Sequence, residues 1–328
     1  MKLRERSTID FDIKTLAGDA SDRTYYRLSF HDKNAFPKSV ILMKLAEPFN
    51  ESESDIIRLQ RFLSGCGVPV PEIYLTKPER GFIYLEDCGD NLLADHVSGA
   101  DNNQMMTLYM KVIDLLMVIQ IECTMKMEPD NPAGLRKFDT DKYMSELRHT
   151  VRYFIKGCRA KQLGPGDEER LEKFFMRLVS PIIEEPMLFT HRDYHARNIL
   201  IKGGHLYILD YQDGRMGPRH YDLASLLYDS YVKLDGDTRN ELINYYMDRW
   251  KLAAKSEFDT KAFNDMLKRV SLQRSLKALG TFGYQAMEKQ NRFYLRFVPD
   301  TLGYIKENLA ALKSAAEDSD WIFSLLNE

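Results

Sequence analysis

Three polar residues, Asp193, Asn198 and Asp210, have the chemical types and the order along the chain that phosphoryl transfer requires. A carboxylate can orient an attacking hydroxyl and accept its proton. An amide oxygen and a second carboxylate are hard oxygen ligands, which can hold Mg²⁺ on the phosphates of a nucleotide. We therefore interpret Asp193 as the catalytic residue, and Asn198 and Asp210 as the metal ligands.

Two short apolar runs must position these groups. One run ends at Thr190 and leads into the polar segment, and a second, from Ile199 to Ile201, leaves it. The sequence Lys202-Gly-Gly-His205 is typical of a hairpin turn, and the partner strand from Leu206 to Leu209 carries Asp210 at its end. The pattern predicts that one rigid β-hairpin and its entry loop hold all three groups.

The same residues carry a family resemblance. His191-Arg-Asp-x-x-x-x-Asn198, followed by Leu209-Asp210, resembles the catalytic core of the protein-kinase-like phosphotransferases. Asp210-Tyr-Gln-Asp213 stands in place of the Asp-Phe-Gly of protein kinases. Gly217-Pro218 and Tyr221-Asp222-Leu-Ala-Ser-Leu226 are similar to the aminoglycoside-phosphotransferase branch, whose members act on small molecules.

Within that branch the chain most resembles the cell-wall sugar kinases, which phosphorylate the anomeric hydroxyl of N-acetylmuramate and N-acetylglucosamine. The residues that carry this narrower resemblance are Gly18-Asp-Ala-Ser-Asp-Arg-Thr-Tyr-Tyr-Arg27, His191-Arg-Asp-Tyr194, Arg197-Asn198, Gln212-Asp213 and Leu272-Gln-Arg-Ser-Leu-Lys-Ala-Leu-Gly-Thr-Phe282. These stretches run from near the N-terminus into the last quarter of the chain.

The resemblance implies an α+β, two-lobed protein-kinase-like fold. A small mixed N-lobe of residues 1–87 would bind the nucleotide, and a larger, mostly helical C-lobe of residues 88–328 would hold the catalytic loop and the acceptor site. The implied reaction is transfer of the γ-phosphoryl group of ATP, with Mg²⁺, to a hydroxyl of a small molecule. The leading acceptor is an N-acetyl amino sugar from peptidoglycan salvage.

Other readings of the same residues stay open. An aminoglycoside, choline, homoserine or fructosamine could be the acceptor. A nucleotide-binding regulator without transfer activity is a hypothesis of a different class. His191 and His195 stand four positions apart, but Arg192 occupies the position where a zinc peptidase helix needs a glutamate, and the flanking residues favour strands. A zinc hydrolase is therefore the weakest alternative.

A polar loop near the N-terminus, Gly18-Asp-Ala-Ser-Asp-Arg23, lies between two β-type runs. Backbone N–H groups in such a loop can cover phosphates, although an ordinary hairpin has the same pattern. By resemblance, Gly18, Ser21 and Arg23 are candidate nucleotide contacts. Arg23 and the nearby Arg27 could each bind a phosphate or form a surface ion pair.

Two further candidates lie in the next β-type runs. Lys44, inside Val40 to Leu45, stands where a kinase places the lysine that contacts the α- and β-phosphates, but a solvent-facing strand lysine fits equally well. Cys88-Gly-Asp90 ends the following run. In the kinase-like fold this is the hinge between the lobes, where adenine would bond to backbone groups around Glu86 and Cys88.

The candidate acceptor contacts are His195, Arg197, Gln212 and Asp213. His195 could brace the loop or face the acceptor, and Arg197 could bind an acceptor carboxylate or pair internally with Asp222. Gln212 and Asp213 follow the predicted metal ligand Asp210, and Asp213 could also be a second acidic metal partner or part of a plain turn.

By contrast, we interpret the basic residues near the C-terminus as a solvated helix face; they are Lys268, Arg269, Arg274 and Lys277.

Composition limits the remaining functions. The formal net charge of the 328 residues is -3, which predicts no binding of nucleic acid or of an anionic membrane. The apolar stretches are too short to span a bilayer, and the N-terminal residues do not predict a secretory signal. The four cysteines are scattered, as expected of reduced thiols in a cytoplasmic protein. The sequence thus predicts a cytoplasmic enzyme whose partner is a small molecule, with a sugar as the leading candidate, and leaves its oligomeric state open.

Overall fold

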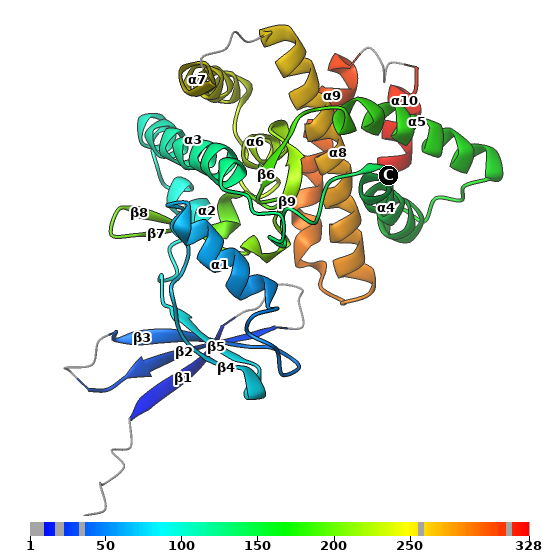
Figure 1. The fold of residues 1–328 in the computed structure, drawn as a ribbon. Coiled ribbons are helices and arrows are strands. Elements are labelled where there is room, and N and C mark those ends of the chain that lie inside the picture. Colours follow the sequence, from blue (N-terminus) through cyan, green and yellow to red (C-terminus); the bar gives the residue numbers. More distant parts are fainter. Residues whose placement is uncertain (1–9, 17–22, 33–36, 255–258, 313–316, 328) are drawn as a thin grey trace, which may run out of the picture.

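The computed structural model describes residues 10–16, 23–32, 37–254, 259–312 and 317–327. Figure 1 shows a β-sheet at one end of the molecule and a larger group of helices at the other, with helix α1 (Asp55–Gly65) between them. All neighbouring strands of the sheet are antiparallel and their order is β1-β2-β3-β5-β4. These strands are β1 (Phe11–Leu16), β2 (Thr24–Phe30), β3 (Ser39–Lys44), β4 (Ile73–Lys77) and β5 (Phe82–Glu86), and a 3₁₀ turn, η1 (Pro78–Arg80), precedes β5.

Helix α1 joins the sheet to the helical part. Its Ile57 packs in a small apolar cluster with Met43 of β3 and Ile83 of β5, whereas Leu59 and Leu63 belong to the main core. At about 100° per residue, Leu59 and Leu63 lie on one side of α1 and Ile57 lies on a different side. Because one helix contributes to both clusters, the sheet is positioned directly against the helices.

The larger part of the molecule is mostly helical. Its helices are α2 (Leu93–Val97), α3 (Asn102–Met125), α4 (Thr140–Thr150), the π-helix η2 (Val151–Cys158), α5 (Pro165–Ile183), α6 (His220–Leu227), α7 (Gly236–Ala254), α8 (Thr260–Met287), α9 (Val298–Ala311) and α10 (Ser319–Leu326). Asp101, Asp139 and Asp259 accept hydrogen bonds from the first turns of α3, α4 and α8, so carboxylate caps define where these helices begin. Helix α8 runs through the middle of this helical group (Figure 1).

Two short sheets lie between the helices. Strand β6 (Met187–Thr190) pairs with β9 (Arg215–Pro218), and β7 (Ile199–Lys202) pairs with β8 (His205–Ile208), both antiparallel. Gly203 and Gly204 connect β7 to β8 with φ values of 58° and 82°, which glycine adopts without steric strain. The predicted hairpin is therefore present. Three 3₁₀ turns complete this part: η3 (Ala196–Asn198), η4 (Tyr211–Asp213) and η5 (Arg292–Phe297).

The main core lies among the helices and beneath the catalytic segment. Phe138 stacks on Tyr143 and on Tyr221, with ring centroids 5.1 Å and 4.2 Å apart. Tyr221 is fully buried at the start of α6, directly before Asp222. In the described part of the chain, no helix combines the length and the apolar character needed to cross a membrane.

Candidate active site

The predicted catalytic segment is a loop between β6 and β7, and a buried carboxylate of α6 holds its first half. Asp222 accepts hydrogen bonds from the backbone N–H of His191 (2.6 Å) and of Arg192 (2.9 Å). Burial raises the pKa of Asp222 to about 6, against the opposing effect of the nearby His191 and its backbone N–H. Arg192 has a φ of 82°, in the left-handed region that non-glycine residues rarely adopt. Asp222 thus holds the loop in a strained shape immediately before Asp193.

A second buried carboxylate holds the other half of the loop. Asp229 accepts hydrogen bonds from the backbone N–H of Ala196 (2.9 Å) and of Tyr231 (2.8 Å). Burial raises its pKa to about 7. Between the two carboxylates, the hydroxyl of Tyr194 donates to the carbonyl oxygen of Val112 in α3 (2.8 Å). The loop is therefore positioned by three elements that are remote from it in sequence.

Asp193 lies between positive charges. Its Oδ1 is 2.9 Å from Nζ of Lys277, and its Oδ2 is 3.9 Å from Nε of Arg192. Burial by itself raises the pKa of Asp193, but the charges of Lys277 and Arg192 outweigh it, and the pKa lies well below its usual range. The carboxylate is therefore ionised and ready to accept a hydrogen bond from a hydroxyl.

The guanidinium of Arg192 lies among three carboxylates. Besides Asp193, it approaches Glu146 of α4 (3.5 Å) and Asp213 (3.4 Å). Glu146 also contacts Lys142 one helical turn earlier, at 3.2 Å. These contacts connect α4 with the catalytic loop and with the segment that follows Asp210.

The structure brings Asn198 and Asp210 to the same end of the β7–β8 hairpin. Asn198 donates from its side-chain amide to the carbonyl oxygen of Asp193 (3.0 Å), and its own carbonyl accepts from the N–H of Leu209 (2.9 Å). Asp210 follows with a φ of 59°, and its Oδ1 accepts from the amide of Gln212 (2.6 Å). Burial and the charge of Asp193 raise the pKa of Asp210, while Gln212 opposes the shift.

Asn198 and Asp210 have the donor set that a hard divalent cation needs. In the described part of the chain, no hydrogen bond occupies Oδ1 of Asn198 or Oδ2 of Asp210. Mg²⁺ in nucleotide sites usually takes one or two protein oxygens and completes its shell with phosphate and water. The two residues therefore fit a magnesium ion. No group of three or more His, Cys, Asp or Glu side chains among the described residues has the geometry of a metal site.

A cleft of about 440 Å³ lies between the sheet and the β7–β8 hairpin. This volume is within the range of small-molecule sites. The lining residues include apolar side chains of the sheet, the segment after β5 and the hairpin; they are Leu16, Tyr25, Ile41, Met43, Leu85, Glu86, Cys88, Arg197, Asn198, Leu200, Leu209, Asp210 and Gln212, among others. Asn198 and Asp210 thus face the same cleft as the segment predicted to contact adenine.

Glu86 and Cys88 lie at the cleft, at the end of β5. The Glu86 carboxylate accepts hydrogen bonds from Lys202 (3.0 Å) and from the hydroxyl of Tyr207 (3.3 Å), both on the β7–β8 hairpin. Cys88 is buried, which raises the pKa of its thiol to about 12. Neither side chain is a free polar group directed at a ligand, so only the backbone of this segment is suited to recognise a base.

The structure places the predicted phosphate contacts that it describes in different surroundings. Gly18 and Ser21 lie outside the described residues. Arg23 is close enough for its charge to act on Asp210. Arg27 lines the cleft, but its guanidinium forms ion pairs with the mostly buried Asp87 (2.7 Å) and with the exposed Asp90 (2.6 Å).

Lys44 is not brought to the cleft. Successive residues of a strand point to opposite faces, and Ile41 and Met43 of β3 line the cleft. Lys44 therefore lies on the opposite face of the sheet, and its side chain is exposed. The geometry matches the alternative of a solvent-facing strand lysine.

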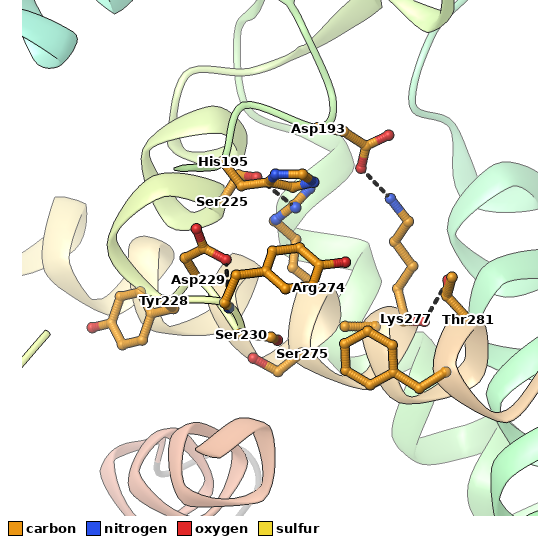
Figure 2. A pocket seen from close by; sticks show the side chains of 13 residues that line it. Asp193, His195, Ser225, Tyr228, Asp229, Ser230, Arg274, Ser275, Lys277 and Thr281 are labelled. Atoms are coloured by element: carbon orange, nitrogen blue, oxygen red, sulfur yellow. Dashed lines mark hydrogen bonds and ion pairs between the residues drawn. The ribbon is translucent and has the colours of Figure 1, made fainter. Parts of the chain in front are cut away.

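A smaller cavity, of about 90 Å³, is lined by Asp193, which does not line the large cleft (Figure 2). Its wall is formed by the catalytic loop, the end of α6 with the segment after it, and α8. The lining residues include Asp193, His195, Ser225, Asp229, Ser230, Tyr231, Arg274, Ser275, Lys277 and Thr281. The volume is below that of typical ligand sites, so the cavity can take only a part of a small molecule or a few waters.

Three of the four candidate acceptor contacts divide between the two cavities. His195 lines the small cavity, and burial lowers the pKa of its ring to about 3, so it is neutral. Arg197 and Gln212 line the large cleft. Arg197 does not pair with Asp222; its guanidinium lies 4.9 Å from the ring centroid of Tyr231. Asp213 is half exposed beside Arg192.

The interpretation of Arg274 and Lys277 as part of a solvated face is wrong. Arg274 donates to the carbonyl oxygen of Arg192 (2.7 Å) and to Ser225 Oγ (2.6 Å), and Lys277 donates to Asp193 (2.9 Å). Both residues face the catalytic loop because α8 packs against α6 and α4. One sequence signal was available: Arg274, Lys277 and Thr281 recur at the spacing of one helix face.

Sheet, hinge segment, helical part and loop together define a kinase-like phosphotransferase. The model of the phosphotransferase enzyme family matches residues 12–255, and the chain belongs to this family. The chain is 28% identical over 319 residues to the N-acetylmuramate/N-acetylglucosamine kinase of Pseudomonas aeruginosa, covering 94% of this chain and 87% of that protein. It is 25% identical over 301 residues to the enzyme of that name from Neisseria meningitidis serogroup B, covering 90% and 85%.

Solved structures confirm the two-lobed kinase-like fold class. The ADP-bound aminoglycoside phosphotransferase APH(2'')-Ib matches with a TM-score of 0.61 at 14% identity, over 95% of both chains. A choline kinase from Cryptosporidium parvum Iowa II matches with a TM-score of 0.61 at 12% identity, over 97% of this chain and 92% of that chain. Its family membership and its kinase-named relatives make the chain an enzyme, a small-molecule kinase, and the family implies ATP use and typically a divalent metal.

Proposed function

We propose that this enzyme transfers the γ-phosphoryl group of ATP, with Mg²⁺, to the anomeric hydroxyl of an N-acetyl amino sugar. The relatives from Pseudomonas aeruginosa and Neisseria meningitidis, which are named for N-acetylmuramate and N-acetylglucosamine, match at least 85% of their own length. The stretches that resemble the cell-wall sugar kinases include both the catalytic loop and the face of α8 that contacts it.

The observation that carries the proposal is that residues of the catalytic loop line two cavities. Asn198 and Asp210 line the cleft of about 440 Å³, and Asp193 lines the cavity of about 90 Å³. The side chain of Asn198 bonds to the backbone of Asp193, which couples the two cavities. A nucleotide in the cleft would therefore present its terminal phosphate next to the carboxylate that faces the acceptor.

On the nucleotide side, the apolar residues Ile41, Met43 and Leu85 would contact the adenine. Backbone groups around Glu86 and Cys88 would form its hydrogen bonds. Arg23, whose charge reaches Asp210, would contact the phosphates, together with the backbone of the loop that contains Gly18 and Ser21. Lys44 has no part in this proposal because it lies on the other face of the sheet.

Asn198 and Asp210 would hold Mg²⁺ through Oδ1 of Asn198 and Oδ2 of Asp210, which accept no hydrogen bond from the residues that the structure describes. Such an ion, when bound, neutralises charge that develops on the phosphate oxygens. Gln212 would keep the carboxylate of Asp210 oriented through its 2.6 Å hydrogen bond.

On the acceptor side, Asp193 would accept a hydrogen bond from the anomeric hydroxyl and then its proton. Phosphoryl transfer has a loose transition state, so orientation of the attacking oxygen contributes more than the basicity of the carboxylate. A low pKa of Asp193 is compatible with that role. His195, a neutral ring in the cavity wall, and Asp213, beside Arg192, are the proposed contacts for the rest of the sugar. Arg197 and Gln212 line the cleft, so they would contact the sugar only where it meets the phosphates.

The test is ADP release from MgATP in the presence of single acceptors. The panel contains N-acetylmuramate, N-acetylglucosamine, kanamycin, choline and homoserine, with an acceptor-free control. We expect turnover with the two N-acetyl sugars, none with their methyl glycosides, and a sugar 1-phosphate as the product in ³¹P NMR. Turnover with an amine-bearing acceptor alone would overturn the proposed substrate.

A further inference from the structure

Lys277 is a buried lysine beside the catalytic loop. Its side chain is 13% exposed, that of Asp193 is 25% exposed, and the ammonium nitrogen lies 2.9 Å from Oδ1 of the carboxylate. A buried ammonium loses hydration free energy, and a counter-charge close to it is needed to compensate this loss. The carboxylate of Asp193 provides that charge, and the ion pair in turn fixes the carboxylate (Figure 2).

Helix α8 carries a second contact to the same loop, one turn before Lys277. Arg274 donates to the carbonyl oxygen of Arg192 (2.7 Å) and to Ser225 Oγ of α6 (2.6 Å). It therefore fixes the backbone directly before Asp193, while Lys277 fixes the side chain. Two adjacent positions on one helix face thus define both the place and the orientation of the carboxylate.

A neighbouring face of α8 is held against α4 by a close approach. A Cβ atom at Gly280 would lie 2.6 Å from Thr150 Oγ1, a distance that real Cβ atoms do not show. Thr150 Oγ1 also donates to the carbonyl oxygen of Leu276, directly before Lys277 (2.7 Å). Little freedom remains for α8 to move relative to α4, so the position of Lys277 is determined by packing.

The two oxygens of Asp193 have different surroundings. Oδ1 accepts the hydrogen bond of Lys277, whereas the basic group near Oδ2 is Arg192 Nε at 3.9 Å, beyond hydrogen-bond distance. Within the described ranges of the chain, no donor is bonded to Oδ2. This oxygen is therefore the one that can accept a hydrogen bond from an acceptor hydroxyl.

The wall of the small cavity has no excess of negative charge. The wall contains the carboxyl groups of Asp193 and Asp229 and the cations of Arg274 and Lys277. Two positive charges in the same small cavity repel each other, and the repulsion is stronger in a partly buried site than in water. A cationic acceptor that approached Oδ2 would meet the ammonium of Lys277, and no surplus carboxylate in this wall would compensate.

We propose that Lys277 is a positioning residue for Asp193 and that its ammonium makes the acceptor site discriminate against cationic acceptors. The inference rests on the proposed function, in which Asp193 accepts the acceptor proton. The acceptor oxygen forms a bond to the γ-phosphorus, the bond from that phosphorus to the β–γ bridging oxygen breaks, and ADP leaves. The hydroxyl proton passes to Oδ2 of Asp193, while Lys277 remains an ammonium ion and gives up no proton.

The experiment compares Lys277→Met and Lys277→Arg in the full chain, with Lys261→Met as the matched control because Lys261 is an exposed lysine near the start of the same helix. The probes are N-acetylglucosamine and glucosamine, at a pH at which the glucosamine amine is protonated. We expect Lys277→Met to lower kcat at least about 10-fold, with KM for MgATP changed less than about 2-fold. Lys277→Arg should recover at least about 3-fold of the lost kcat.

The preference for N-acetylglucosamine over glucosamine, as a ratio of kcat/KM values, should fall at least about 5-fold in Lys277→Met. It should stay unchanged in Lys277→Arg and in Lys261→Met. Wild-type kcat in a folded Lys277→Met variant would overturn the positioning role, and an unchanged preference would overturn the discrimination. Unaltered MgATP binding identifies a folded variant.

Failure of the proposed function has a separate signature, which is that the wild type turns over neither sugar. The inference is then tested without an acceptor, by a double-mutant cycle on the free energy of unfolding with Asp193→Asn, Lys277→Met and the double variant. A non-additive cycle supports the ion pair that the inference requires. An additive cycle overturns it.

Discussion

The backbone N–H of Arg192 donates a hydrogen bond to Asp222 over 2.9 Å, and Arg192 adopts a φ of 82°. A left-handed conformation at a non-glycine residue costs about 1–3 kcal/mol and persists only where the surrounding structure enforces it. Asp222 supplies that enforcement from α6, and its position next to the fully buried Tyr221 ties the loop to the core. The shape of the loop at Asp193 is therefore set from outside the loop.

Replacing Asp222 by asparagine should damage both stability and activity. In asparagine an NH₂ group replaces one carboxylate oxygen, so a donor would face a backbone N–H donor. We therefore expect a loss of about 1–3 kcal/mol in the free energy of unfolding. We expect turnover to fall about 10- to 100-fold, because the loop would shift Asp193. Denaturant unfolding and steady-state kinetics measure the two effects. Asp248→Asn, at an exposed carboxylate of α7, is the control and should change neither.

The substitution Asp193→Asn should separate chemistry from nucleotide binding. The amide keeps the shape of the side chain but cannot accept the acceptor proton, so we expect kcat to fall about 10²- to 10⁴-fold. MgATP affinity should stay within about 2-fold, because Asp193 lines the small cavity and not the cleft. Calorimetric titration of MgATP alongside kinetics checks this. Full turnover by the variant would contradict the role given to Asp193.

Asp210→Ala should change the dependence of the reaction on magnesium. Removing one of two proposed metal ligands should raise the Mg²⁺ concentration for half-maximal rate at least about 10-fold and weaken MgATP binding. Asp213→Ala is the informative comparison, because Asp213 is half exposed and pairs with Arg192 at 3.4 Å. We expect its magnesium dependence to match that of the wild type. Equal magnesium profiles for all three proteins would rule out Asp210 as a ligand.

Gly280→Ala should destabilise the enzyme through the α8–α4 contact. The added Cβ would lie 2.6 Å from Thr150 Oγ1, and overpacking of this kind costs about 1–3 kcal/mol. Gly303→Ala in α9 has no atom within 4 Å of the new Cβ, so there the higher helix propensity of alanine should stabilise by up to about 1 kcal/mol. Thermal unfolding of both variants should show shifts of opposite sign.

The stability of the fold should depend on pH through Asp229. Burial raises its pKa from 3.8 to about 7, so the folded state binds a proton more readily than the unfolded state. The wild type should therefore gain stability relative to Asp229→Asn as the pH falls from about 7 to about 4, with no further gain below that range. The expected gain is about 2–4 kcal/mol, measured as the difference in unfolding free energy between the two proteins at several pH values. A difference that is constant from pH 8 to pH 4 would contradict the raised pKa.

Local patterns in the sequence were sufficient for the hairpin that carries Asn198 and Asp210. The alternation of apolar runs, the Gly203-Gly204 turn and the spacing of polar groups are all short-range features, and short-range geometry decides where the ends of a hairpin lie. The predicted phosphate contact of Lys44 depended on strand register, which no short local pattern fixes. The residue type fits a phosphate contact, but the register that pairs β3 with β2 and β5 puts Ile41 and Met43 on the cleft side.

By itself, the sequence determined the chemical groups of the catalytic segment, because these depend on the order of local elements along the chain. It indicated the two-lobed α+β class through the resemblance of its motifs to the kinase-like phosphotransferases. Only the tertiary structure decided what surrounds Asp193. Lys277 and Arg274 come from α8, and Asp222 and Asp229 come from α6 and the segment after it. Charges so distant in sequence meet only after helix packing removes the water between them. The helical spacing of Arg274 and Lys277 places both on one face of α8, but it does not tell which element that face meets.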